Sequence, residues 1–370
     1  MIRFTRVILV VLISAIGISA EAGSESVGNG GDAIRCFDAT LGGWVYESLD
    51  LFEERRIEPG SLIEPIKKGD VSSELERAFT RLSKFSPQRA AVYRRRAQEL
   101  LKDPSRWLSG RYHDITQDYL PFRVQVASSC RIDNVAVFRT GTFGSAPVIS
   151  FYKEVFSRLS SQDQAAAIIH ELMYSEVASA GVRNSSLIRA VVAVLFRKDF
   201  ESMSLRDFIG LIKRNGLSIY EANGALLAFE AEDGFKFDPQ FNNAGVVVSG
   251  YALLNSTFHF PTLGERQIRH QIHFDDDGRV QAAILSMPTS LKIGINRVVV
   301  SSNASVAFYA TGGIRQVTLA EPALIRFKDG SIRRIKTGSV LVFDTASNVL
   351  LVSTNAANRA GRAFSARPVL

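Results

Sequence analysis

The sequence predicts an α+β fold in which a mainly helical N-terminal domain precedes an antiparallel β-hairpin-repeat (meander) sheet domain. A change in hydrophobic spacing supports this prediction. Apolar residues recur at helical intervals through much of residues 23–230, whereas residues 235–353 read as short strands separated by tight turns. The length of 370 residues is long for one hydrophobic core and sufficient for two domains of ordinary size.

Residues 1–22 have the pattern of a secretory signal peptide. Arg3 and Arg6 form a basic start, an apolar stretch follows from Val7 to Ala20, and Ala20-Glu21-Ala22 has the small-x-small pattern of a cleavage site. The apolar stretch is shorter than the roughly 20 residues that a transmembrane helix needs, and no later run is long enough. We therefore expect an exported protein, periplasmic or extracellular, with no transmembrane segment in the mature chain.

Cys36 and Cys130 are the two cysteines of the chain. In an oxidising compartment an even pair typically forms one structural disulfide rather than a redox centre or a metal site. We therefore predict a Cys36–Cys130 disulfide.

Helix signals recur through residues 23–230. Ser86-Pro87 predicts a helix that reaches about Leu101 and stops before Pro104. Ser161-x-x-Gln164 matches a capping box and predicts a helix to Ala180, with Gly181 as its C-terminal stop. Alternating apolar residues indicate one short β segment, near residues 122–138.

The strand region is built from a repeated pattern in which a strand ends on Phe, a tight turn follows and a second strand returns. In the first two copies the apolar alternation continues out of phase after the turn, which predicts a β-bulge in the return strand. We expect the repeated Phe residues to be structural. The copies are Ile272–Val280, Val306–Ile314, Ile325–Ile332 and Leu341–Val349, with a weaker fifth at Phe241–Val247 and a C-terminal tail at 354–370.

The predicted helix 161–180 carries the candidate site. His170-Glu171-Leu172-Met173-Tyr174 matches the zinc-protease pattern H-E-x-x-H except that Tyr174 stands where the second histidine belongs. Helical spacing places His170 and Tyr174 together at the edge of the apolar face and Glu171 toward the polar side. Glu176 falls near the middle of the apolar face.

One interpretation of this helix is a rebuilt metal site. A catalytic zinc needs about three protein ligands and an open position, and in H-E-x-x-H the glutamate is the general base. Here His170 would bind the metal together with Glu176 and His113, and Glu171 would be the catalytic residue. Zinc is the cofactor that this interpretation implies.

The other interpretation is structural and needs no cofactor. An unpaired buried charge is too costly, so Glu176 requires a partner, and Arg189 on the next helix or Arg183 in the connection is the candidate. His170 and Tyr174 then form a pair at the edge of the core. Tyrosine is a poor replacement for a zinc-binding histidine, which favours this interpretation.

The positive charge of the chain, +7 overall, is concentrated in residues 66–111, which hold twelve Lys or Arg against five Asp or Glu. Such a stretch is typical of a solvated helix face. It would also offer a surface to anionic envelope polymers or lipid headgroups. Export argues against a nucleic-acid partner.

Several short motifs follow one another in a fixed order along the chain. They are GNGGD at 28–32 with Cys36, Leu49-Asp50-Leu51-Phe52-Glu53, Ser129-Cys130 with Val135-Ala136-Val137, and H-E-x-x-Y-x-E with Asn184-Ser185 and Arg189. Together they resemble a group of uncharacterised exported proteins of Gram-negative bacteria. The similarity covers roughly residues 28–195 and implies compartment and architecture, because no function is established for the group. Its members vary between H-E-x-x-H-like and H-E-x-x-Y forms, some with a further histidine near position 182; Val182 here weakens a metal role.

Two classes of function follow from the sequence. The first is a non-enzymatic binding or interaction module of the cell envelope or the secreted fraction, whose repeat sheet presents the binding surface. The alternative is a metal-dependent hydrolase centred on His170 and Glu171, with the sheet as a targeting module.

Overall fold

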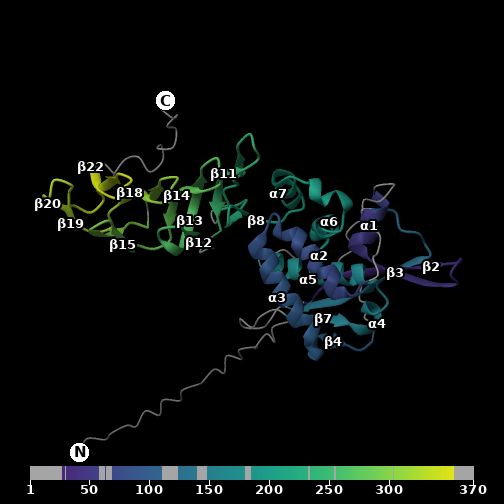
Figure 1. Cartoon of the computed structure of the whole chain (residues 1–370). Coiled ribbons are helices and arrows are strands. Elements are labelled where there is room, and N and C mark those ends of the chain that lie inside the picture. The colour runs from purple at the N-terminus through teal and green to yellow at the C-terminus, as the bar shows by residue number, and fades with distance from the viewer. Residues whose placement is uncertain are drawn as a thin grey trace, which may run out of the picture.

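The computed structural model describes residues 27–29, 31–57, 63, 69–110, 124–139, 148–179, 185–231, 234–253, 256–302 and 304–353. The fold is α+β: an N-terminal part of mixed helices and small sheets precedes a C-terminal part built on one large antiparallel sheet (Figure 1). The predicted α+β class is therefore confirmed. The signal-peptide pattern and the C-terminal tail lie outside the described residues.

Two small sheets accompany the N-terminal helices. One has the strand order β3-β2-β5 and the other β1-β6-β7-β4, with β4 and β7 parallel and the remaining pairs antiparallel. The sequence predicted only the segment near residues 122–138, where β5 and β6 lie. The strands are β1 (Val27–Asn29), β2 (Asp32–Asp38), β3 (Gly43–Ser48), β4 (Trp107–Leu108), β5 (Cys130–Asn134), β6 (Ala136–Arg139) and β7 (Val148–Tyr152).

Local capping sets the helix boundaries. The Asp70 carboxylate accepts from the Ser73 amide at the start of α2, and Pro87 opens α3 as predicted. The cap of α5 lies one residue earlier than predicted, because Ser160 Oγ accepts from the Asp163 amide at 3.2 Å. The helices are α1 (Leu49–Ile57), α2 (Val71–Ser83), α3 (Pro87–Lys102), α4 (Lys153–Phe156), α5 (Ser161–Ser179), α6 (Ser186–Val194) and α7 (Leu205–Arg214), with 3-10 turns at Pro104–Arg106 and Lys198–Ser202.

None of the helices in the described part of the chain is long and apolar enough to cross a bilayer.

The large sheet has 11 strands, in the order β22-β21-β18-β17-β14-β13-β11-β9-β8, with β10 on β11 and β12 on β13. Two further hairpins form small sheets of their own. In the chain, β15–β16 is inserted between β14 and β17, and β19–β20 between β18 and β21. The strands are β8 (Ile219–Ala222), β9 (Ala225–Ala228), β10 (Gln240–Phe241), β11 (Val247–Ala252), β12 (Ser256–Phe260), β13 (Gly264–Phe274), β14 (Val280–Leu285), β15 (Thr289–Ile293), β16 (Asn296–Val300), β17 (Ser305–Phe308), β18 (Ile314–Thr318), β19 (Ala323–Arg326), β20 (Ile332–Ile335), β21 (Val340–Phe343) and β22 (Val349–Ser353).

The predicted bulges are present in the hairpins of this sheet. Phe274 pairs with Val280, and the next pairs show one extra residue in the return strand, β14. The β17–β18 and β21–β22 hairpins repeat this shift, between Ala307 and Phe308 and between Val342 and Phe343. Phe274, Phe308 and Phe343 are all buried, which fits the structural role expected for them.

The two parts of the chain share one hydrophobic core. Its buried residues include Ile212 of α7, Tyr220 of β8 and Phe260 of β12 in one continuous cluster. At the junction, the Glu221 carboxylate of β8 accepts from the backbone amides of Gln88 and Arg89 at the start of α3. The large sheet thus begins within residues 23–230, the range that the sequence assigned to the helical domain.

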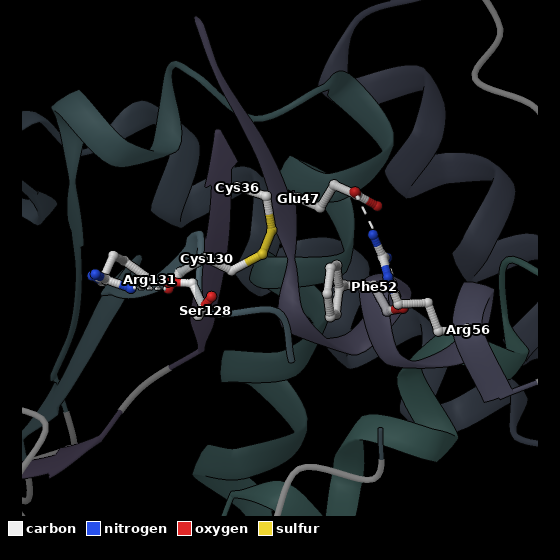
Figure 2. Close-up of a disulfide and its surroundings, with 7 residues drawn as sticks. All are labelled: Cys36, Glu47, Phe52, Arg56, Ser128, Cys130 and Arg131. Atoms are coloured by element: carbon white, nitrogen blue, oxygen red, sulfur yellow. Dashed lines mark hydrogen bonds and ion pairs between the residues drawn. A yellow bond between two sulfur atoms is a disulfide. The ribbon is translucent and has the colours of Figure 1, made fainter. Parts of the chain in front are cut away.

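The predicted disulfide joins Cys36 of β2 to Cys130 of β5, which are direct cross-strand partners (Figure 2). On the inner side, Cys130 packs with Phe52 in a small second core. The Arg56 guanidinium lies 3.4 Å from the centre of the Phe52 ring and 3.9 Å from a carboxylate oxygen of Glu47. The crosslink therefore fastens the small sheet to the first turns of α1.

Replacing both cysteines with alanine should lower the free energy of unfolding by about 4–5 kcal/mol, because the crosslink closes a loop of 94 residues and so restricts the unfolded chain. Urea unfolding of the oxidised protein, the reduced protein and Cys36→Ala/Cys130→Ala measures this loss, and the last two should agree. Titration of denatured, unreduced protein should detect no free thiol. Two thiols per chain would contradict the disulfide.

Candidate functional site

His170 and Glu171 both lie in the interior of the N-terminal part. Their side chains are 1% and 0% exposed, on the middle of α5. The expectation that Glu171 faces the polar side of the helix is therefore wrong. The reason is that α5 is covered on several sides, by α2, α3, α1, α6 and the small sheets, so helical spacing alone did not identify a solvent face.

His170 is held by a carboxylate of α1. Its Nδ1 lies 2.9 Å and 3.2 Å from the two carboxylate oxygens of Asp50, which is itself buried. This contact fixes the ring orientation and leaves Nε2 directed away from Asp50. Nε2 is buried and has no hydrogen-bond partner among the described residues.

Glu171 is held by the backbone that leads into β2. Its Oε1 accepts a hydrogen bond from the Gly31 amide, and the Gly31 carbonyl in turn accepts from the amides of Val135 and Ala136. A Cβ added at Gly31 would lie 3.1 Å from Glu171 Oε1 and 3.5 Å from the His170 ring. A glycine at this position therefore allows the chain to approach the His-Glu pair closely.

Arg189 forms the third corner of this buried group. Its guanidinium lies 3.2 Å from Oε1 of Glu53 on α1 and 3.7 Å from Oδ2 of Asp32 on β2. Asp32 also accepts from the Asn134 side-chain amide at 3.2 Å. Arg189 thus links α6, α1 and β2 around the same interior.

Burial and neighbouring charges shift the pKa values of both candidate groups, Glu171 and His170. Burial raises the pKa of Glu171 to about 7, and this outweighs the opposing effects of His170 and the Gly31 amide. Burial disfavours the charged form of His170, but attraction and hydrogen bonding from Asp50 are stronger together, so the pKa of His170 is raised. Both groups therefore keep their protons to a higher pH than the same side chains do in an unfolded chain.

Glu176 belongs to a separate ion-pair group. Its carboxylate pairs with Arg89 of α3, with N–O distances of 2.6 Å and 3.0 Å, and accepts from the Tyr93 hydroxyl. The prediction that Arg189 pairs with Glu176 is therefore wrong. Helical spacing showed that Glu176 needs a cation, but the packing of α3 against α5 supplies Arg89 instead.

Tyr174 is buried and packs edge-on against Phe138 of β6, with ring centres 5.1 Å apart. It does not form the side-chain pair with His170 that the sequence predicted, because the two residues face different neighbours. His113, the other proposed ligand, lies outside the described residues.

The site also contains residues that sequence reasoning missed. Asp50, Gly31 and Asp32 all contact the His-Glu pair or its neighbours. A signal was present, because Gly31 and Asp32 belong to the GNGGD motif and Asp50 to the motif at 49–53. The spacing of those motifs gave no indication that they converge on α5.

The described residues do not by themselves complete a metal site. No group of three or more His, Cys, Asp or Glu side chains among them has a geometry that could hold a metal ion. Glu176 is committed to Arg89 rather than directed at His170. Comparison with known protein families, with curated proteins and with solved structures gave no significant match.

The basic stretch at 66–111 is largely engaged in internal contacts. Arg77 and Arg94 pair with Glu74 and Glu76, and Arg81 donates to the Leu195 carbonyl at 2.9 Å. Arg96 donates to Ser175, and Arg106 pairs with Asp103. Most of its guanidinium groups are therefore used to pack helices.

Replacing Glu171 with Gln should flatten the dependence of stability on pH. The folded protein holds a proton on Glu171 that the unfolded chain releases above about pH 4.5, so stability falls as the pH rises from about 4.5 to about 7. The raised pKa of His170 acts in the same direction, since its stabilisation is complete below about pH 6.5 and is lost as the pH rises through the folded value.

Urea unfolding measures the free energy of unfolding between pH 5 and pH 8. Its fall over this range should be smaller in Glu171→Gln than in the wild type by up to roughly 3 kcal/mol, which is the free energy equivalent of a pKa shift of about two and a half units. Glu76→Gln is the control, because this partly exposed carboxylate has a lowered pKa and titrates below that range. Equal slopes for the wild type and Glu171→Gln would contradict the raised pKa.

Replacing Glu176 with Ala should lower the free energy of unfolding by about 2 kcal/mol, because the nearly buried Arg89 loses its main counter-charge. The expected loss is below that for a fully buried pair, since the Glu176 side chain is 27% exposed and water screens it. Glu76→Ala removes the more exposed Glu76–Arg94 pair and should cost less than about 1 kcal/mol. Equal losses in the two variants, measured by urea unfolding, would refute a special role for Glu176.

Proposed function

We propose that this protein is an exported protein of the cell envelope or the secreted fraction that acts as a non-enzymatic binding module. The observation that carries the proposal is the enclosure of the His170–Glu171 pair. Both side chains are at most 1% exposed, and each is held by a neighbour that fixes a segment of the fold. A hydrolytic site needs an opening for its substrate. The side chains of His170 and Glu171 are instead enclosed and hold neighbouring segments of the fold in place.

Export is supported by the signal-peptide pattern in residues 1–22 and by the Cys36–Cys130 disulfide, since structural disulfides persist in oxidising compartments. We propose the hairpin-repeat meander of residues 235–353 as the binding part. Repeated units of this kind create an extended surface whose side chains can vary without loss of the fold. The basic stretch at 66–111 is a weaker candidate, because most of its arginines are engaged in internal contacts.

The second candidate function is a metal-dependent hydrolase, and one observation favours it. Histidines that bind metals commonly donate the other ring nitrogen to a carboxylate, as His170 does to Asp50, and His170 Nε2 has no partner among the described residues. The pKa of Glu171, about 7, is also suited to a general base. In this case His170 would be a ligand and Glu171 the base.

Metal analysis of the purified mature protein separates the two candidates. As a binding module, the protein should contain zinc well below one ion per chain, and a chelator should leave its melting temperature unchanged. His170→Ala should lower the melting temperature, because Asp50 would be left buried without its partner. The exposed residue His259 supplies the control, His259→Ala, which should behave as the wild type.

A different outcome of the metal analysis would favour the hydrolase. One zinc ion per chain that is lost in His170→Ala and retained in His259→Ala would overturn the binding-module proposal and establish the metal site.

A further inference from the structure

A hollow of about 260 Å³ opens in the large sheet where strands β9, β11 and β13 meet. Its floor is apolar and its rim carries groups that bind ligands elsewhere in proteins. The apolar lining is Ala228, Ala231, Ala252 and Leu253, and the polar lining is Glu230, Tyr251, Arg269 and His270. These residues belong to β9, β11, β13 and their loops, whereas the buried group around His170 is built on α1, α5, α6 and the start of β2.

The hollow exists because the pairing of β13 changes partner there. The β12 ladder ends with Ser256 opposite Ile268, and the β11 ladder begins with Tyr251 opposite Gln271. Arg269 and His270 lie between the two ladders. On the other side of β13, the register with β14 also shifts between Arg269 and His273.

His270 takes a left-handed backbone conformation at this point, with φ of 59°. The two other non-glycine residues with positive φ in the described chain, Asn223 and Ser347, lie outside strands in hairpin turns. Successive residues of a regular strand point to opposite faces, whereas Arg269 and His270 both line the hollow. Strained backbone of this kind is concentrated at ligand sites.

No carboxylate among the described residues neutralises the cation in the hollow, Arg269. Arg269 is partly buried, its Nε is buried without a hydrogen-bond partner, and none of the described carboxylates forms an ion pair with it. Beside it, the Tyr251 hydroxyl lies 3.0 Å from His270 Nδ1. Glu230 lines the same hollow without pairing with Arg269. The site therefore offers a cation, a Tyr-His pair and a separate carboxylate around an apolar floor.

We propose that this hollow binds the carboxylate and ring of an acidic sugar, the unit of an anionic envelope polysaccharide. The proposal rests on the function proposed above and names the ligand class. Arg269 receives the sugar carboxylate through its planar fork of N–H donors. The Tyr251 ring covers the apolar face of the sugar, and Glu230 accepts hydrogen bonds from its hydroxyl groups.

Size and charge favour a sugar acid over a phosphate ester. The hollow lies just below the range of about 300–1,000 Å³ that is typical of drug-sized ligands, so it suits a single ring. A phosphate carries nearly two negative charges and requires more positive charge than one arginine supplies beside the carboxylate of Glu230. A carboxylate carries one charge, which Arg269 balances.

Isothermal titration of the full mature protein with D-glucuronate, D-glucose and glucose 6-phosphate tests the proposal. The wild type should bind D-glucuronate at millimolar concentration, as expected for one subsite, and D-glucose at least tenfold more weakly. Arg269→Gln should weaken glucuronate binding at least tenfold. Arg266→Gln changes an arginine of the same strand that does not line the hollow, and it should bind as the wild type does.

His270→Gly provides a second readout, because glycine adopts positive φ without strain. This variant should keep or raise the melting temperature while it weakens glucuronate binding several-fold. Equal glucuronate affinity in the wild type and Arg269→Gln would overturn the site, and tighter binding of glucose 6-phosphate than of glucuronate would overturn the carboxylate assignment. If glucuronate does not bind and the protein contains no zinc, the proposal for this hollow is rejected and the binding-module function is not. Stoichiometric zinc on His170 would instead reject the binding-module function.

Discussion

The hydrogen bond from the Gly31 amide to Glu171, beside the His170–Asp50 pair, is the interaction on which the N-terminal part depends. These two contacts bring together the start of β2, the first helix α1 and the central helix α5. The close approach requires the absence of a side chain at Gly31. From this point β2 continues into its pairing with β5 and the disulfide, so one small contact determines where the first sheet lies against the helices.

The charges of this interior explain why it tolerates burial. Asp32, Asp50, Glu53 and Glu171 face Arg189 and His170, so four carboxylates meet two groups able to carry positive charge. Protonation of Glu171 removes one negative charge and protonation of His170 adds a positive one, and the pKa of each group is shifted in the direction that reduces the imbalance. The raised pKa of His170 also disfavours metal binding, because metal ions bind the neutral imidazole. The arrangement that stabilises the fold therefore opposes the chemistry that the H-E pair first indicates.

The hairpins of the large sheet were predictable from the sequence because their signals are local. A terminal Phe, a turn and a phase change after it occur within about ten residues, and the bulges after Phe274, Phe308 and Phe343 follow that pattern. The pairing of β2 with β5 was not predicted, because these two strands are far apart in the chain, with Asp32 opposite Asn134. The site shows the same limit: helical spacing established that Glu176 needs a partner, but only the packing of α3 on α5 selects Arg89 over Arg189.

The irregularity at Arg269 and His270 differs in kind from the bulges of the repeat. Each repeated hairpin within the large sheet has one register shift beside its Phe, whereas the β13–β14 ladder has a second shift farther along the strand. The turn does not require this second shift. At the second shift His270 takes a backbone conformation that is rare in strands. In a fold whose local choices otherwise agree with the architecture, such departures are expected at functional positions. The cost of strain and of an uncompensated arginine at this point is therefore best explained by a ligand that balances the charge of Arg269.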